Sequence, residues 1–94
     1  MRSKRRDANQ HEIVEALRKA GYQVIDLAST GDGIPDLMVV SKYGRIVLIE
    51  IKSPGGRLTE PEKRFITEFT GPVRIVRSAE EAIEIMQGYD EEDE

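Results

Sequence analysis

Two apolar segments joined by a three-residue link constrain the fold of this chain most. Residues 36–41 (Asp-Leu-Met-Val-Val-Ser) and 45–51 (Arg-Ile-Val-Leu-Ile-Glu-Ile) are rich in β-branched side chains, which is typical of strands. The link Lys42-Tyr43-Gly44 is short and contains glycine, so it predicts an antiparallel hairpin. The nearly continuous apolar character of both segments predicts a sheet that is covered on both faces.

The remaining segments predict helices and strands around this hairpin. Their apolar residues recur with the period of a helix or of a strand, and glycine or proline stands at their ends. The expected elements are a helix over 7–20, a strand over 22–28, the two hairpin strands, a helix from Thr59, a strand over 73–76 and a helix from Ser78. We therefore expect one α/β domain of order α-β-β-β-α-β-α, with a mixed sheet flanked by helices.

The composition excludes several classes of protein. The chain contains no cysteine and a single histidine, which excludes a disulfide scaffold, a thiolate zinc site, a cysteine nucleophile and a histidine-rich metal site. No apolar run approaches the roughly 20 residues that a transmembrane helix requires. The charges at the start of the chain are not followed by an apolar stretch, so we expect no secretory signal and an intracellular protein.

Charge gathers at both ends of the chain. Residues 2–6 carry four basic side chains and no acidic one, whereas the last five residues are all acidic and contribute to a net charge of −4. We expect a basic N-terminal arm over 1–6, a folded domain over 7–87 and an acidic tail over 88–94. Both ends are either solvated termini, or a phosphate-contacting arm and a partner-binding tail.

Three charged residues occupy positions that are difficult to explain by packing alone. Asp36 begins one buried strand, and Glu50 and Lys52 share one face at the end of the next. If the turn is centred near Tyr43, the numbers of paired residues sum to about 86, which places Asp36 opposite Glu50 with their Cβ atoms roughly 5 Å apart. Two buried carboxylates this close repel unless a cation lies between them, and a hard divalent ion such as Mg²⁺ or Mn²⁺ suits them. The alternative is an ordinary cross-strand charge cluster in which Lys52 pairs with either acid.

These residues resemble a known active-site signature. Ile34-Pro35-Asp36 followed by Ile49-Glu50-Ile51-Lys52 is similar to the signature of the PD-(D/E)XK nuclease superfamily. The flanking sequence resembles more narrowly the VRR-NUC group, the virus-type replication-repair nucleases. The segments that carry this likeness are Asp7-Ala-Asn-Gln10 with Glu12, Gly33-Ile-Pro-Asp36, Gly55-Gly-Arg-Leu-Thr59 and Val76-Arg-Ser-Ala-Glu-Glu81.

The resemblance implies a role for each matching residue. Asp36 and Glu50 would bind Mg²⁺ or Mn²⁺, the backbone carbonyl of Ile51 would complete the set of protein ligands, and Lys52 would be the catalytic lysine. By the same resemblance Glu12 would be a helix-borne acid that approaches the metal, and its position about 40° beyond the edge of the apolar arc of its helix fits this role. Other residues are expected to contact DNA phosphates, namely Arg57, Lys4, Arg5, Arg6 and His11.

One position departs from the family pattern. Family members often carry a glutamine near the start of the helix that follows the Gly-Gly loop, and this chain has Glu62 and Lys63 there instead. Whether either residue replaces the glutamine stays open at this point, because Glu62 is also explained by a capping box with Thr59.

The activity that the resemblance implies is metal-dependent, structure-selective cleavage of DNA. We expect a homodimer that resolves four-way (Holliday) junctions in DNA repair or recombination, in the cytoplasm, or in the host cytoplasm if the chain comes from a phage. A flap or end-processing nuclease, or a nicking enzyme that needs a partner, would use the same chemistry. A non-catalytic DNA-binding module and a protein-interaction domain acting through its acidic tail are alternatives of a different class.

Overall fold

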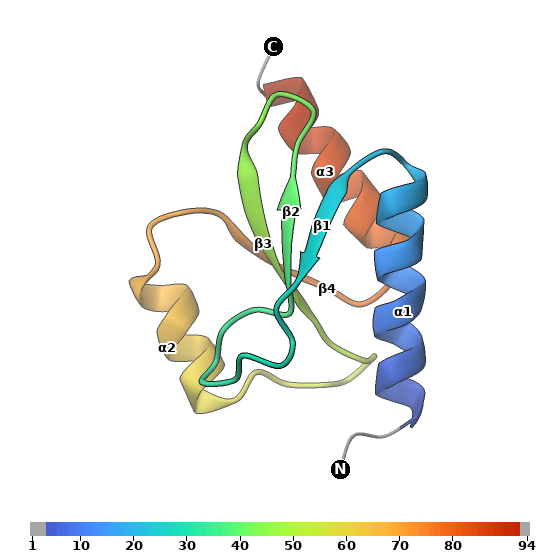
Figure 1. The fold of residues 1–94 in the computed structure, drawn as a ribbon. Coiled ribbons are helices and arrows are strands. Elements are labelled where there is room, and N and C mark those ends of the chain that lie inside the picture. The colour runs from blue at the N-terminus through green and yellow to red at the C-terminus, as the bar shows by residue number, and fades with distance from the viewer. Residues whose placement is uncertain (1–3, 93–94) are drawn as a thin grey trace.

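The computed structural model describes residues 4–92, and the side chains of residues 8–91. Three helices and four strands follow one another in the order expected from the sequence (Figure 1). Their bounds are α1 (Lys4–Lys19), β1 (Gln23–Asp26), β2 (Leu37–Val40), β3 (Ile46–Ile51), α2 (Glu60–Glu68), β4 (Val73–Val76) and α3 (Ala79–Glu92). The predicted α/β class and the mixed sheet are thus confirmed.

The four strands form one sheet in the order β1-β2-β3-β4. β1, β2 and β3 are antiparallel neighbours, while β4 runs parallel to β3 because α2 carries the chain back across the sheet. In the hairpin, Leu37 pairs with Ile49 and Val39 pairs with Val47. This is the predicted register, and continuing it by one residue sets Asp36 opposite Glu50.

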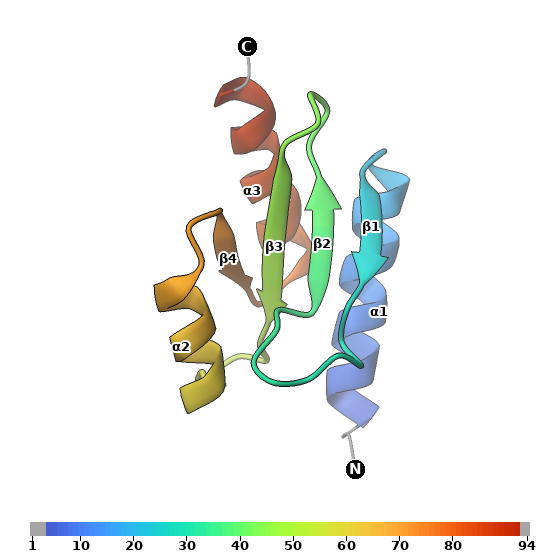
Figure 2. The same cartoon turned by 60° about the vertical axis from the view of Figure 1, so that its left-hand side comes forward.

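The core lies on one face of the sheet. Side chains alternate along a strand, so Val47, Ile49 and Ile51 of β3 all point to the same side. There they pack against α1 and α3, which lie together behind the sheet in Figure 2. From α1 the core receives Ile13 and Leu17, both fully buried. The odd-numbered residues of β3 therefore belong to the core, whereas the even-numbered ones, which include Glu50, point to the opposite face of the sheet.

The opposite face is covered less completely than the apolar strands predict. The side chains of Ile25 in β1 and Ile46 in β3 are each 51% exposed, so this face is not closed along its whole length. Of the three described helices, only α2 lies on this side, near one end of the sheet (Figure 2). No residue of α2 is fully buried, because the helix is too short and too peripheral to seal the face. The prediction that both faces of the sheet are covered is therefore correct only for the part of the sheet next to α2.

The first helix, α1, begins three residues earlier than the expected start at residue 7. Residues 4–6 of the expected arm already belong to α1, and residues 1–3 lie outside the described residues. Gln10 on this helix is buried and its side-chain amide donates a hydrogen bond to Asp26 at 3.1 Å. Among the described residues, no helix has the length and apolar character needed to cross a membrane.

The predicted acidic tail is in large part a helix. α3 continues to Glu92, and Asp90 is buried against the domain. Its carboxylate accepts hydrogen bonds from the Tyr22 hydroxyl at 2.6 Å and from the backbone N–H of Lys42 at 2.8 Å. The sequence hid this contact, because nothing in the run of five acids sets Asp90 apart from its neighbours. Asp90 thus joins α3 to the hairpin turn rather than extending into solvent.

The bond between Tyr22 and Asp90 gives a prediction about stability. Burial and the hydrogen bond to the Asp90 carboxylate raise the pKa of Tyr22 to about 12 from its ordinary 10.0. Replacing Tyr22 with Phe removes this bond and is expected to lower the free energy of unfolding by about 1–2 kcal/mol at neutral pH. Urea unfolding of the two proteins measures this difference.

The same pair makes the difference depend on pH. Because the folded state holds the Tyr22 proton more tightly than the unfolded state, its contribution to stability is fully present below about pH 10 and is lost as pH rises through about 12. The stability difference between the natural protein and Tyr22→Phe should therefore shrink over that window. A difference that stays constant from pH 9 to about pH 12 would contradict this account.

Candidate functional site

Asp36 and Glu50 are buried together where β2 begins and β3 ends. Asp36 is 4% exposed and Glu50 is 1% exposed. The Asp36 carboxylate is held in place by the backbone N–H of Ile51, which donates a hydrogen bond to it at 2.8 Å. Residue Ile51, whose carbonyl the family resemblance assigns to a metal, therefore lies next to both acids.

The environment of Glu50 is unfavourable for its own negative charge. The pKa of this carboxyl is raised from 4.5 to about 8, first by burial and then by the nearby carboxylates of Asp36 and Glu62. Its Oε2 atom is buried without a hydrogen-bond partner among the described residues. The nearest cation is the Lys52 ammonium, 3.7 Å from Oε2. A carboxylate in this state is costly unless a further positive charge reaches it.

Lys52 is oriented mainly by Glu62 rather than by Glu50. The distance from Lys52 Nζ to Glu62 Oε1 is 2.7 Å, and both side chains are nearly buried, with 11% and 13% of their surface exposed. Burial raises the pKa of Glu62, but the hydrogen bonds from Lys52 and from the Thr59 backbone outweigh this and lower it. Glu62 thus stays charged and holds the lysine at the edge of the carboxylate pair.

A capping box fixes Glu62 at this place. Thr59 accepts a hydrogen bond from the backbone N–H of Glu62 at 3.3 Å, while its own N–H donates to the Glu62 carboxylate at 2.8 Å. The start of α2 is also pressed against Gly33, since a Cβ on Gly33 would lie 2.4 Å from the Pro61 carbonyl oxygen. Only glycine permits this approach, so the loop before Asp36 and the first turn of α2 are locked together.

The structure distinguishes Glu62 from Lys63 by what each one contacts. The residue that stands near the family glutamine position contacts Lys52, whereas Lys63 pairs with the exposed Glu60 at 3.1 Å. The capping pattern predicted where Glu62 sits on its helix, but nothing in the sequence showed that the same carboxylate reaches the lysine. That contact depends on how α2 docks against the sheet end.

The structure does not bring Glu12 to the carboxylate pair. Its side chain is exposed on α1 and borders a hollow that it shares with Ser53 and Arg77. Asn9, one helical turn earlier, borders the hollow that contains Lys52. The described residues contain no group of three or more histidine, cysteine, aspartate or glutamate side chains arranged to hold a metal ion. The two carboxylates Asp36 and Glu50 are therefore the acidic core of the site.

The residues expected to contact DNA fall into three groups. Arg57 is exposed and borders the hollow of Asn9 and Lys52, close to the site. His11 is exposed on α1 and has no described contact with the carboxylates. The side chains of Lys4, Arg5 and Arg6 lie outside the described residues.

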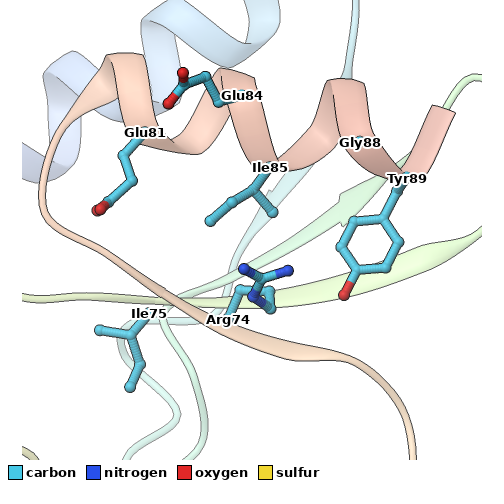
Figure 3. A pocket seen from close by; sticks show the side chains of 7 residues that line it. All are labelled: Arg74, Ile75, Glu81, Glu84, Ile85, Gly88 and Tyr89. Atoms are coloured by element: carbon cyan, nitrogen blue, oxygen red, sulfur yellow. The ribbon is translucent and has the colours of Figure 1, made fainter. Parts of the chain in front are cut away.

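A separate hollow of about 380 Å³ lies between β4 and α3 (Figure 3). Arg74 points into it toward Ile85 and Tyr89, and Glu81 and Glu84 stand above it on the helix. None of Asp36, Glu50 and Lys52 lines it. This hollow is therefore distinct from the carboxylate site.

The element order, the mixed sheet and the carboxylates at its end are the arrangement of PD-(D/E)XK-type nucleases. Comparison with known families identifies a particular group within this class: the family model of the VRR-NUC domain matches residues 2–80. The chain belongs to the VRR-NUC family, and this membership implies a nuclease of the PD-(D/E)XK type.

A solved structure described as a VRR_NUC domain has the same fold. It superposes with a TM-score of 0.75 at 23% identity, over 93% of this chain and 99% of the other. No curated protein matches the chain significantly. At this level of identity, the likeness in structure supports the fold.

The donor set at the site fits a hard divalent cation. Carboxylate oxygens are the ligands that Mg²⁺ and Mn²⁺ prefer, and Glu50 offers an oxygen with no donor among the described residues. Such an ion would offset both the burial of the Glu50 charge and its repulsion by Asp36, which raise the Glu50 pKa. Asp36 and Glu50 are the residues that would hold it, with Ile51 beside them.

The burial of Glu50 beside other carboxylates predicts an effect of this residue on stability. Because the pKa of about 8 in the folded protein exceeds the ordinary 4.5, stability is greatest when Glu50 is protonated and falls as pH rises from about 4.5 through about 8. Without metal, Glu50→Gln is expected to unfold at a higher temperature than the natural protein at about pH 9, by roughly 4–8 °C for each kcal/mol of repulsion removed. Thermal melts in EDTA measure this difference.

The control is Glu60→Gln, which alters an exposed carboxylate on α2 away from the pair. Added Mg²⁺ should raise the melting temperature of the natural protein and leave that of Glu50→Gln nearly unchanged. If Glu50→Gln melts below the natural protein at about pH 9 without metal, the proposed repulsion does not exist.

Proposed function

We propose that this protein is a divalent-metal-dependent endonuclease that hydrolyses DNA phosphodiester bonds. The observation that carries the proposal is the buried pair Asp36 and Glu50, with an unpartnered Glu50 oxygen and the Lys52 ammonium 3.7 Å away. Membership of the VRR-NUC family supports the same chemistry. An ordinary charge cluster would pair its buried acids fully, and this one leaves an acceptor free for an ion.

Each residue of the cluster has a defined part in this chemistry. A divalent cation held by Asp36 and Glu50 supplies Lewis acidity toward a phosphate ester. Lys52, held at 2.7 Å by Glu62, presents a positive charge toward the oxygens on which negative charge grows during hydrolysis. Glu62 orients this ammonium through a contact outside the carboxylate pair, so the lysine need not neutralise Asp36 or Glu50.

The substrate that we propose is branched DNA, cut by a homodimer. A domain of 94 residues grips only a short length of duplex, and two sites related by a two-fold axis suit a symmetric four-way junction. The same site on a monomer would suit a flap, an end or a nick, which are the alternatives that the resemblance leaves open. We also propose an intracellular location, because the proposed substrate is DNA.

Cleavage of a labelled DNA panel tests this function. The panel contains a four-way junction, a flap, a linear duplex and a single strand, each with Mg²⁺, Mn²⁺ or EDTA. We expect paired symmetric cuts in the junction with either metal and none in EDTA. Replacing Lys52 with Ala should reduce the rate by about 10²–10³-fold, because it removes a preorganised charge at the reacting phosphate.

Lys63→Ala is the matched control, since it removes an exposed ammonium from α2, the helix that carries Glu62, and Lys63 pairs with Glu60 outside the site. It should cut at close to the natural rate. Undiminished cutting by Lys52→Ala would overturn the site assignment. Absence of cutting by folded protein with bound metal would favour the non-catalytic DNA-binding module.

A further inference from the structure

The turn that follows Lys52 is held in one shape. Ser53-Pro54-Gly55-Gly56 closes with a hydrogen bond from the Gly56 N–H to the Ser53 carbonyl at 2.9 Å. Gly55 has φ +79°, the conformation that a type II turn demands after proline. The turn thus begins directly after the expected catalytic lysine and ends directly before Arg57.

Arg77 clamps both ends of this turn. Its Nη1 donates hydrogen bonds to the carbonyl of Ser53 at 2.7 Å and to the carbonyl of Gly56 at 3.0 Å. The backbone of Arg77 is itself anchored, because its N–H donates to the Glu81 carboxylate at 2.6 Å. One guanidinium therefore ties the turn to the end of β4 and the start of α3.

The clamped turn forms the wall of a hollow of about 140 Å³ beside the site. Lys52 and Arg57 contribute positive charge to the hollow, and Asn9 contributes a side-chain amide from α1. Positively charged groups with an amide donor are the partners that a DNA backbone phosphate prefers. Arg57 is the next residue after Gly56, so the position of its side chain depends on the turn that Arg77 holds.

We propose that Arg77 is a positioning residue for DNA binding. It fixes the turn over 53–56 so that Arg57 and Lys52 face the same stretch of DNA backbone, with a phosphate seated in the hollow that they share with Asn9. The Nη1 of Arg77 is engaged by the two carbonyls, so we assign Arg77 to holding the turn rather than to contacting the DNA. This inference rests on the proposed nuclease function and concerns the way in which the substrate is held.

The matched control for Arg77→Met is Arg74→Met. Both arginines lie at or next to β4 and carry the same charge, but Arg74 lines the hollow of Figure 3 and not the turn. Loss of general electrostatic attraction to DNA is therefore shared by the two variants. Arg77→Lys keeps the charge but replaces the planar guanidinium, whose Nη1 makes both bonds, with an ammonium of different geometry.

The experiment measures the Kd for a labelled duplex by fluorescence anisotropy in EDTA, so that binding is observed without cleavage. Arg77→Met is expected to weaken binding by about threefold to tenfold more than Arg74→Met, and Arg77→Lys to fall between them. In an Arg57→Met background, Arg77→Met should weaken binding no more than Arg74→Met does. Exchange of the Gly56 amide hydrogen should be faster in Arg77→Met than in the natural protein.

Several results would overturn the inference. These are equal Kd values for Arg77→Met and Arg74→Met, full additivity of Arg77→Met with Arg57→Met, or a natural protein that does not bind DNA. If Arg77→Met melts much earlier than the natural protein, Arg77→Lys decides the question. A natural protein that binds DNA with the expected pattern but cuts none would refute the proposed nuclease and leave the positioning role of Arg77 standing.

Discussion

The buried pair of carboxylates at the end of the hairpin is the feature on which the site depends. The register of β2 against β3 places Asp36 opposite Glu50, and the alternation of side chains turns both away from the core. The odd-numbered residues of β3 stabilise the domain against α1 and α3. The same strand can therefore hold the fold with one face and carry a costly charge on the other.

Two contacts outside the pair organise the residues around it. On one side, α2 is fixed by Gly33 and by the bond between Glu62 and Lys52, although no residue of the helix is fully buried. On the other side, Arg77 holds the turn after Lys52. The lysine lies between these two supports, so its position depends on polar contacts more than on packing.

The sequence predicted what depends on local periodicity and failed where the outcome depends on docking. The hairpin, its register and the capping box of α2 follow from spacing alone, and all three were confirmed. The helical period gives the direction in which Glu12 points around α1 but not its height along the sheet, and the structure sets Asn9 at the level of Lys52. Likewise, the contact of Glu62 with Lys52 and the burial of Asp90 join segments far apart in the chain, which no spacing rule reports.

The most direct test of the central claim is a calorimetric titration of the protein with Mn²⁺ at about pH 7, in buffers of different ionisation enthalpy. A divalent ion at the pair should displace the proton that Glu50, with its pKa of about 8, retains near neutral pH. We predict Mn²⁺ binding with release of close to one proton, and loss of both binding and proton release in Asp36→Asn and Glu50→Gln. Binding that persists unchanged in both variants, or absence of binding to the natural protein, would contradict a metal site at Asp36 and Glu50.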